Sequence, residues 1–270
     1  MMISRKQRIM NGVNEHYQEA LKHFKEFQIV GIFLQGSQNY GLDYEKSDID
    51  TKLIVIPSFE DIAFNRKPVS TTHVRENDEH IDFKDIRLYI NEFRKQNINF
   101  LEILFTPYCW INPKYFPYWD SLVSYRESIG RYNQYRAINA MRGMAYEKFA
   151  QMEKSMPHNA ADIEKYGYEP KQLSHIMRLN DFAERYIANM SFKSCLIPSN
   201  RDEIMNAKLG NYSLEDARNL AREHLKHIDE LCTSYCDTHE PSTNHLVDII
   251  LDSAQEDIIK VAMKTELEIY

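Results

Sequence analysis

Residues 29–56 read IVGIFLQGSQNYGLDYEKSDIDTKLIVI, two apolar runs joined by a polar connector. The first run, 29–34, is short and rich in β-branched and aromatic residues, which predicts a buried strand. The second run, 48–56, predicts another strand that ends before a proline. The N-terminal part of the chain is therefore expected to be built on a β-sheet, and the connector between these strands is the first place to look for a site.

The second predicted strand opens with two carboxylates, Asp48 and Asp50. Alternate residues of a strand share one face, so these side chains are expected to form a pair about 7 Å apart. An oxygen-only pair of this kind suits hard divalent cations such as Mg²⁺.

Gly36 and Ser37 end the first predicted strand. A glycine in this position lets backbone N–H groups approach a ligand, and a helix starting behind it would direct its positive end at an anion. Together with Asp48 and Asp50, this predicts a nucleoside triphosphate whose phosphates lie at Gly36-Ser37. The alternative is an ordinary hairpin whose charged connector is solvated.

A third carboxylate is expected from the predicted strand 79–85, EHIDFKD. Ile81 and Phe83 alternate with polar residues, which places Asp82 on the polar face, approaching the first pair from a neighbouring strand. Asp78 and Asp85 are the alternatives, although Asp85 falls on the apolar side.

The rest of the first half predicts helices at 4–27 and 86–96 and a long polar connection at 58–77 with one helical turn near 59–63. A proline- and aromatic-rich stretch follows, and we place a domain boundary after it, giving domains 1–125 and 126–270. The second domain is helical by pattern, with helices expected at 132–156, at 172–190, from 200, from 213 and at 243–268.

In the second domain, Lys171, His175 and Arg178 recur at helical spacing and share one face. Such a face is able to bind triphosphate oxygens or the phosphate of an acceptor; the alternative is an ordinary solvated face. Cys232, Cys236 and His239 offer three zinc ligands, with His227 or His245 as a fourth. They lie in a predicted helix and lack paired C-x₂-C motifs, which does not favour a tetrahedral structural site.

Composition restricts the partners. The net charge is −7, and from residue 200 onward 7 Lys+Arg face 15 Asp+Glu, a balance of −8 that leaves the first 199 residues near +1. A broad nucleic-acid surface normally carries a basic excess, which argues against one in the C-terminal third. The basic groups between Arg126 and Lys154 leave room for a short acceptor strand. Four cysteines, no bilayer-length apolar run and no signal-like N-terminus predict a cytoplasmic protein with no membrane partner.

The connector and the aspartates resemble the nucleotidyltransferases of the DNA polymerase β superfamily, in finer detail the branch called predicted nucleotidyltransferases or the RNA repair pathway polymerase-β family. Further segments similar to that branch are Asn99…Leu101-Glu102, Gly143-Met144-Ala145-Tyr146 and Lys171-x₃-His175-x₂-Arg178. The resemblance spans residues 30 to 190.

This resemblance implies an α+β fold, with a polymerase-β-like nucleotidyltransferase domain, a small mixed sheet flanked by helices, and an all-helical C-terminal domain. It implies an enzyme that moves an NMP from an NTP to a hydroxyl, an RNA 3′ end such as that of tRNA, and releases pyrophosphate. Two Mg²⁺ or Mn²⁺ ions would be held by Asp48, Asp50 and Asp82. The implied nucleotide-binding residues are Gly36, Ser37, Asn39, Tyr40, Lys171, His175 and Arg178.

Two other functions stay open from the sequence. One is nucleotidylation of a protein side chain, as in related small antitoxin transferases. The other is a catalytically silent nucleotide sensor, whose signature would be the loss of one carboxylate; all three candidates are present. The base preference, the acceptor and the oligomeric state are not fixed by these patterns.

Overall fold

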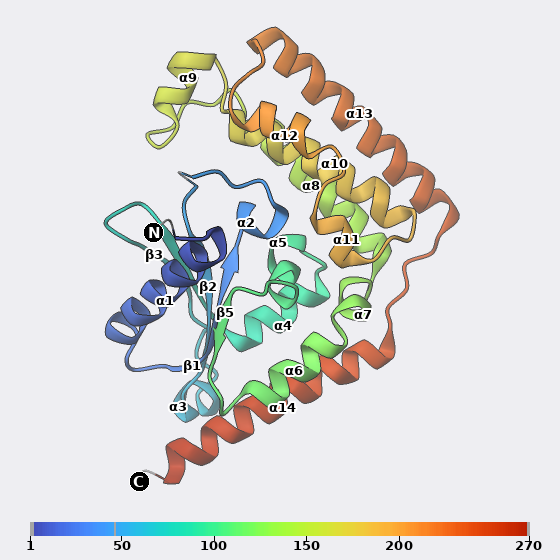
Figure 1. Cartoon of the computed structure of the whole chain (residues 1–270). Coiled ribbons are helices and arrows are strands. Elements are labelled where there is room, and N and C mark those ends of the chain that lie inside the picture. Colours follow the sequence, from blue (N-terminus) through green and yellow to red (C-terminus); the bar gives the residue numbers. More distant parts are fainter. Residues whose placement is uncertain (1–2, 46, 269–270) are drawn as a thin grey trace. The chain divides into compact units, whose positions relative to one another are not determined.

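The computed structural model describes residues 3–45 and 47–268, which form an α+β protein (Figure 1). One five-stranded sheet has the order β3-β4-β2-β1-β5. Its strands are β1 (Gln28–Gln35), β2 (Asp50–Ile56), β3 (Ser70–Val74), β4 (His80–Asp85) and β5 (Cys109–Ile111). β2 and β4 run parallel and the other neighbours antiparallel, so the predicted α+β class and small mixed sheet are confirmed.

The described chain falls into two compact units. The first comprises Met1–Asn39, Asp43–Tyr132 and Asn244–Tyr270, and the second comprises Tyr40–Leu42 and Asn133–Thr243. The chain therefore leaves the first unit after Tyr132, a few residues beyond the boundary expected from the sequence. It returns for its last helix, which the sequence had assigned to the helical domain.

The first unit holds the sheet together with the following helices: α1 (Arg5–His23), α3 (Phe59–Ala63), α4 (Ile86–Arg94), α5 (Ile98–Leu101), the 3₁₀ turn η1 (Glu102–Leu104), α6 (Phe116–Ser124), α7 (Arg126–Gly130) and α14 (His245–Glu268). α14 buries one row of apolar side chains, Val247, Leu251, Ala254, Ile258 and Ala262, and Arg94 of α4 pairs with its Asp248 and Asp252, at 3.2 and 2.5 Å. The acidic end of the chain thus has basic partners in the first unit.

The second unit is helical, as expected. Its helices are α8 (Gln134–Gln151), α9 (Ala160–Tyr166), α10 (Pro170–Ile187), α11 (Phe192–Leu196), α12 (Arg201–Lys208) and α13 (Leu214–Thr238). α10 lies at its centre and buries most of its residues, among them Phe182 and Tyr186.

Helices cover both faces of the sheet, which explains why β1 and β2 are buried along nearly their whole length. On one face, Ile9 and Val13 of α1 pack with Leu53 and Val55 of β2. On the other face, Phe33 of β1 lies against Trp119 of α6, with ring centroids 4.5 Å apart.

Three local predictions differ from the structure. β2 begins at Asp50, so Asp48 lies in the connector before it. β3 lies inside the stretch 58–77 that was expected to be a loop; it is an edge strand with mostly exposed side chains, so it has no apolar alternation. The helix expected after Gly36 is a single turn, α2 (Ser37–Tyr40), too short to present a helix dipole to a ligand.

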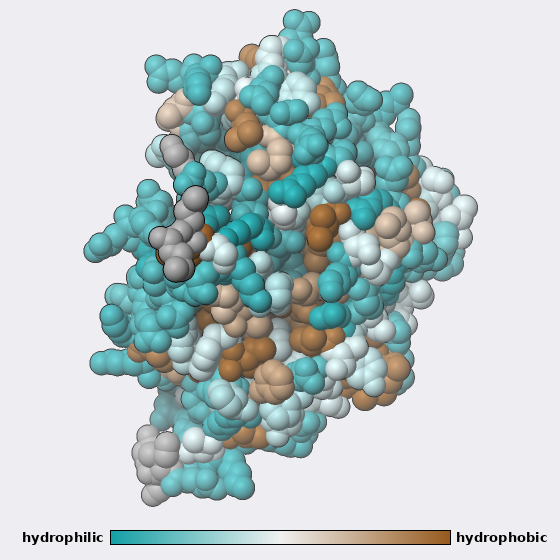
Figure 2. Space-filling view, in the orientation of Figure 1, coloured by the Kyte–Doolittle hydropathy of each residue, from teal (hydrophilic) through white to brown (hydrophobic). Residues whose placement is uncertain are grey.

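No helix within residues 3–45 and 47–268 is long and apolar enough to cross a membrane. On the face drawn in Figure 2, hydrophilic side chains predominate and apolar ones lie in small groups between them.

Two glycines give a matched test of the sheet packing. A Cβ on Gly31 of β1 would lie 2.8 Å from the Trp110 carbonyl oxygen of β5, a backbone atom that cannot move alone. Gly31→Ala is expected to cost about 1–3 kcal/mol in the free energy of unfolding. Gly143 lies inside α8 with nothing within 4 Å of its Cβ position, so Gly143→Ala should stabilise by about 0.5–1 kcal/mol. Thermal and urea unfolding of both variants would measure this, and equal effects would contradict the packing described.

Candidate functional site

The connector after β1 is held from inside the protein by Glu102. Gly36 adopts φ +91°, which favours glycine, although a Cβ there would meet nothing within 4 Å. Its N–H donates to the Glu102 carboxylate, 3.3 Å to Oε1 and 3.4 Å to Oε2. The Gly36 amide therefore faces an internal carboxylate, and phosphate binding by Gly36 and Ser37 stays a prediction. Ser37 Oγ lies 3.5 Å from Gln38 Oε1, at the outer limit of a hydrogen bond.

Asn39, predicted to bind nucleotide, also takes part in this internal network. Its Nδ2 donates to the Leu34 carbonyl at 3.0 Å and reaches Glu102 Oε2 at 3.4 Å, while its Oδ1 accepts from Thr106 Oγ1 at 2.7 Å. Asn39 thus fixes the connector against the end of β1. Glu102 is 2 % exposed and was noticed in the sequence only as part of a similar segment, not as a site residue.

The two aspartates of the D-x-D pattern are positioned in different ways. Asp50 opens β2, and its Oδ1 accepts the His80 N–H at 2.9 Å and lies 3.1 Å from His80 Nδ1. Asp48 is exposed in the connector, where its carbonyl accepts from Gln38 Nε2 at 2.5 Å. Ile49 between them is buried in the core under α1. The same-face argument from strand alternation therefore does not apply to Asp48.

Asp82 lies on β4, the strand next to β2, and on the same sheet face as Asp50. Its partner in the parallel register is Lys52, two residues beyond Asp50. Lys52 is 3 % exposed, and its Nζ lies 3.3 Å from Asp82 Oδ2. Thr72 Oγ1 of β3 donates to the other oxygen at 2.7 Å. Lys52 was not identified from the sequence as a site residue, although its position two residues after Asp50 places both side chains on the same face of the strand.

Charge keeps Asp82 ionised. Burial alone would raise the pKa of this carboxyl, but the positive charges of Lys52 and Lys84 and the hydrogen bond from Thr72 hold it below its ordinary value. Asp82 is thus a carboxylate at neutral pH.

The three aspartates supply only oxygen donors, which suits a hard cation such as Mg²⁺. They do not form a closed cluster: among the described residues, Glu19, His23 and His73 are the one trio of His, Cys, Asp or Glu whose ligand atoms all lie within 4.8 Å. Asp50 and Asp48 fit one divalent cation by donor chemistry. Asp82 already has Lys52 as a positive partner, which supplies part of the charge that a second ion would bring.

Glu79 holds the D-x-D segment through the backbone. Its Oε1 accepts the Ile49 N–H at 3.0 Å, and its Oε2 accepts from Arg75 at 2.6 Å and from Asn77 at 2.8 Å. His16 of α1 joins it, with Nε2 3.0 Å from Oε2. Burial opposes the charge, but the bonds from His16, Asn77 and Ile49 lower the pKa of Glu79 to about 2.

The alternatives for the third carboxylate have other places. Asp85 is 2 % exposed and caps α4, accepting the Arg87 N–H at 2.8 Å and pairing with the Arg87 guanidinium at 2.6 Å. Its expected place on the apolar side is confirmed. Asp78 lies exposed in the turn before β4, with φ +64°.

In the second unit, Arg178 has an unusual environment. It is 3 % exposed, its Cζ lies 4.1 Å from the centroid of the Tyr40 ring, and its Nε and Nη1 have no hydrogen-bond partner among the described residues. Tyr40 belongs to this unit, and Lys208 donates to the carbonyl of nearby Leu42 at 2.7 Å. A buried guanidinium with unpaired donors is costly unless an anion is supplied.

His175 lies one turn before Arg178 on α10. Burial, followed by the positive charges of Arg178, Lys171, Lys148 and Lys208, holds the pKa of its imidazole well below the ordinary value. His175 is therefore neutral at pH 7 within a positively charged group of side chains. Such a group favours anions.

Cys232 and Cys236 lie inside α13, where Cys232 Sγ contacts Asn139 Oδ1 at 3.5 Å. Burial and the neighbouring Cys236 raise the pKa of the Cys232 thiol to about 11.

No protein-family model and no curated protein matches the chain. Among solved structures, it is similar to a nucleotidyltransferase-like protein from Exiguobacterium sibiricum, with a TM-score of 0.28 and 10% sequence identity. The similarity covers 84% of this chain and 75% of that chain.

Glu79→Gln tests the backbone support of the site. A carboxylate whose pKa falls from 4.5 to about 2 on folding stabilises the fold above pH 4.5, and this contribution disappears as the pH falls toward 2. The variant is expected to lose up to about 3 kcal/mol in the free energy of unfolding at pH 7. Its difference from wild type should shrink between pH 4.5 and 3. Urea unfolding across this range measures it; Glu76→Gln, exposed on the same turn, is the control. A pH-independent difference would contradict the assignment.

Proposed function

We propose that this chain is a metal-dependent nucleotidyltransferase, which moves an NMP from an NTP to a hydroxyl group and releases pyrophosphate. The observation that carries the proposal is the shared sheet face of Asp50 and Asp82, on adjacent parallel strands, directly after a glycine-serine connector. Carboxylates that share one sheet face and can hold divalent cations are what this chemistry requires.

In this proposal Asp48 and Asp50 hold the divalent cation, which stabilises negative charge on the reacting oxygens when bound. His80 orients Asp50 through its N–H and its ring. Because the Gly36 amide is bonded to Glu102, the Ser37 hydroxyl is the connector group that would donate to a phosphate oxygen.

Asp82 and Lys52 have complementary roles in the proposal. A carboxylate with a lowered pKa is a weak proton acceptor. Asp82 therefore acts mainly through its charge, and as a ligand if a second Mg²⁺ or Mn²⁺ binds. Lys52, fixed opposite it in the register, prevents Asp50 and Asp82 from repelling each other before a cation arrives.

For the second unit, we propose that Lys171, His175 and Arg178 bind phosphate groups, either those of the triphosphate or those of the acceptor. The two unpaired nitrogens of Arg178 support this, because buried guanidinium N–H groups without a partner need an acceptor such as a phosphate oxygen. The basic side chains around His175 favour a phosphate-bearing acceptor, and we propose an RNA 3′ end. If the NMP from an α-labelled NTP were transferred to a protein and not to RNA, that result would support protein nucleotidylation.

Ligand-dependent unfolding tests the proposed donor site without knowledge of the acceptor. Each NTP would be tested with Mg²⁺. At about a hundredfold over its Kd, the NTP with the preferred base is expected to add about 2.7 kcal/mol to the free energy of unfolding, or about 5–10 °C to Tm. The shift should require Mg²⁺ and disappear in Asp50→Asn. Asp78→Asn, at an exposed turn residue whose φ suits asparagine, should keep it. A shift that Asp50→Asn retains, or none with any NTP in folded protein, would contradict the proposal.

Arg178→Met tests the anion site separately. Inorganic tripolyphosphate is expected to raise the Tm of wild type but not of the variant. Without ligand the variant should lose less than about 1 kcal/mol, because removing an unpaired buried charge offsets the lost contact with Tyr40. Differential scanning fluorimetry measures both, with exposed Arg222→Lys as the control. A large loss of stability with an unchanged tripolyphosphate shift would assign Arg178 a purely structural role.

A further inference from the structure

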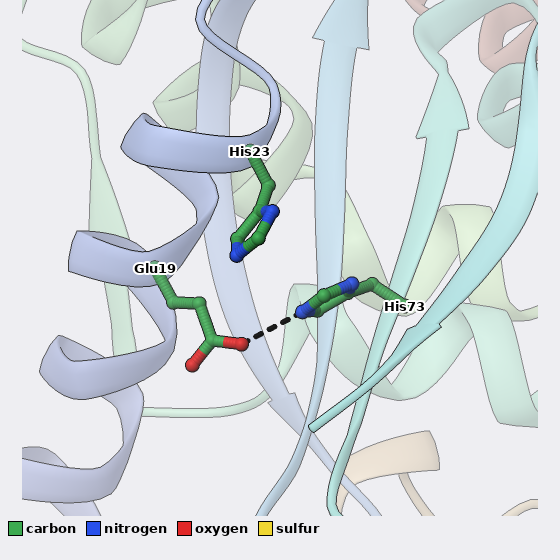
Figure 3. A group of neighbouring side chains, drawn as sticks. All are labelled: Glu19, His23 and His73. Atoms are coloured by element: carbon green, nitrogen blue, oxygen red, sulfur yellow. Dashed lines mark hydrogen bonds and ion pairs between the residues drawn. The ribbon is translucent and has the colours of Figure 1, made fainter. Parts of the chain in front are cut away.

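Glu19, His23 and His73 converge on the α1 side of the sheet, apart from the aspartates (Figure 3). Glu19 and His23 lie one helical turn apart near the end of α1, and His73 lies on the edge strand β3. Their ligand atoms all lie within 4.8 Å of one another. We propose that these three side chains form a binding site for a borderline divalent cation such as Zn²⁺.

The geometry is close to that of a bound ion. His73 Nε2 lies 2.7 Å from Glu19 Oε1, and the His23 and His73 rings are 4.6 Å apart between centroids. Figure 3 shows a ring nitrogen of His23 directed toward the Glu19 carboxylate. Tetrahedral zinc separates its ligand atoms by about 3.3 Å. An ion would require the exposed His23 side chain to rotate and the Glu19–His73 hydrogen bond to open.

A second layer of side chains orients the carboxylate. Arg75 Nε donates to Glu19 Oε2 at 2.8 Å, which leaves Oε1 facing the imidazoles. Hydrogen bonds of this kind fix metal ligands and tune their affinity.

The local charge also permits a cation. Arg75 is paired with Glu79 at 2.6 Å as well as with Glu19, so these three groups together carry one negative charge. The carbonyl groups at the C-terminus of α1 add a partial negative charge beside His23. Glu19 and His73 side chains are each 25 % exposed, which leaves a path for the ion and for a water as fourth ligand.

The donor set determines which metals fit. Two imidazole nitrogens and one carboxylate suit Zn²⁺, Co²⁺, Ni²⁺ and Cu²⁺, whereas Mg²⁺ prefers oxygen alone. This site is therefore chemically distinct from the aspartates, and its existence does not depend on the proposed transferase activity.

Isothermal titration of the untagged full chain with Zn²⁺ tests the proposal. We expect one equivalent to bind, with the affinity reduced at least tenfold in His23→Ala and in His73→Ala. His158→Ala, at an exposed histidine of the second unit, should bind like wild type. His23→Ala is the decisive variant, because the Glu19–His73 bond remains and the fold should keep its Tm. No binding at micromolar Zn²⁺, or equal binding by His23→Ala, would overturn the proposal.

Co²⁺ absorption spectra distinguish this site from the cysteines. Cobalt bound by nitrogen and oxygen should show d–d bands without an intense sulfur-to-metal charge-transfer band. A charge-transfer band lost in Cys232→Ser would place the metal at α13 and overturn the proposal. Zn²⁺ binding by Asp50→Asn should be unchanged, so failure here and failure of the transferase proposal are separable.

Discussion

Glu79 is an ionised carboxylate inside the first unit, and the arrangement of the candidate site depends on satisfying it. A partly buried negative charge must be matched by donors, and Glu79 obtains them from α1, from the turn before β4 and from the backbone of Ile49. The last of these bonds fixes the residue between Asp48 and Asp50. One electrostatic requirement therefore joins the helix that covers the sheet to the segment that presents the aspartates.

Glu102 imposes a similar constraint on the first residues of the same connector, after β1. It accepts the Gly36 amide and the Asn39 side chain, so it shapes the glycine-serine turn from below. In both places an internal carboxylate holds a backbone N–H, and the side chains of Ser37, Asp48 and Asp50 are the groups proposed to bind a ligand. Lys52 of β2 neutralises the charge of Asp82 on the neighbouring parallel strand β4. The site is organised by buried ion pairs and amide–carboxylate bonds more than by helix dipoles.

The sequence predicted the parts of this arrangement that follow from periodicity. Apolar runs identified β1, β2 and α1, and alternation placed Asp82 on the polar face of β4. It could not predict β3, whose side chains are mostly exposed, or the return of α14 to the first unit, because an apolar row on a helix does not show which element it packs against. Register also lay beyond the sequence, because only strand pairing brings Lys52, not Asp50, opposite Asp82. The roles of Glu79 and Glu102 depend on contacts between residues 30 and 66 positions apart in the chain.

The most direct test of nucleotidyl transfer follows the fate of the α-phosphate. Wild-type protein would be incubated with each α-labelled NTP, Mg²⁺ and separate pools of RNA or protein, with pyrophosphate measured in parallel. The account predicts label on one acceptor class and an equal amount of pyrophosphate, both lost in Asp50→Asn. Release of inorganic phosphate with a nucleoside diphosphate, or label transfer that persists in Asp50→Asn, would contradict it.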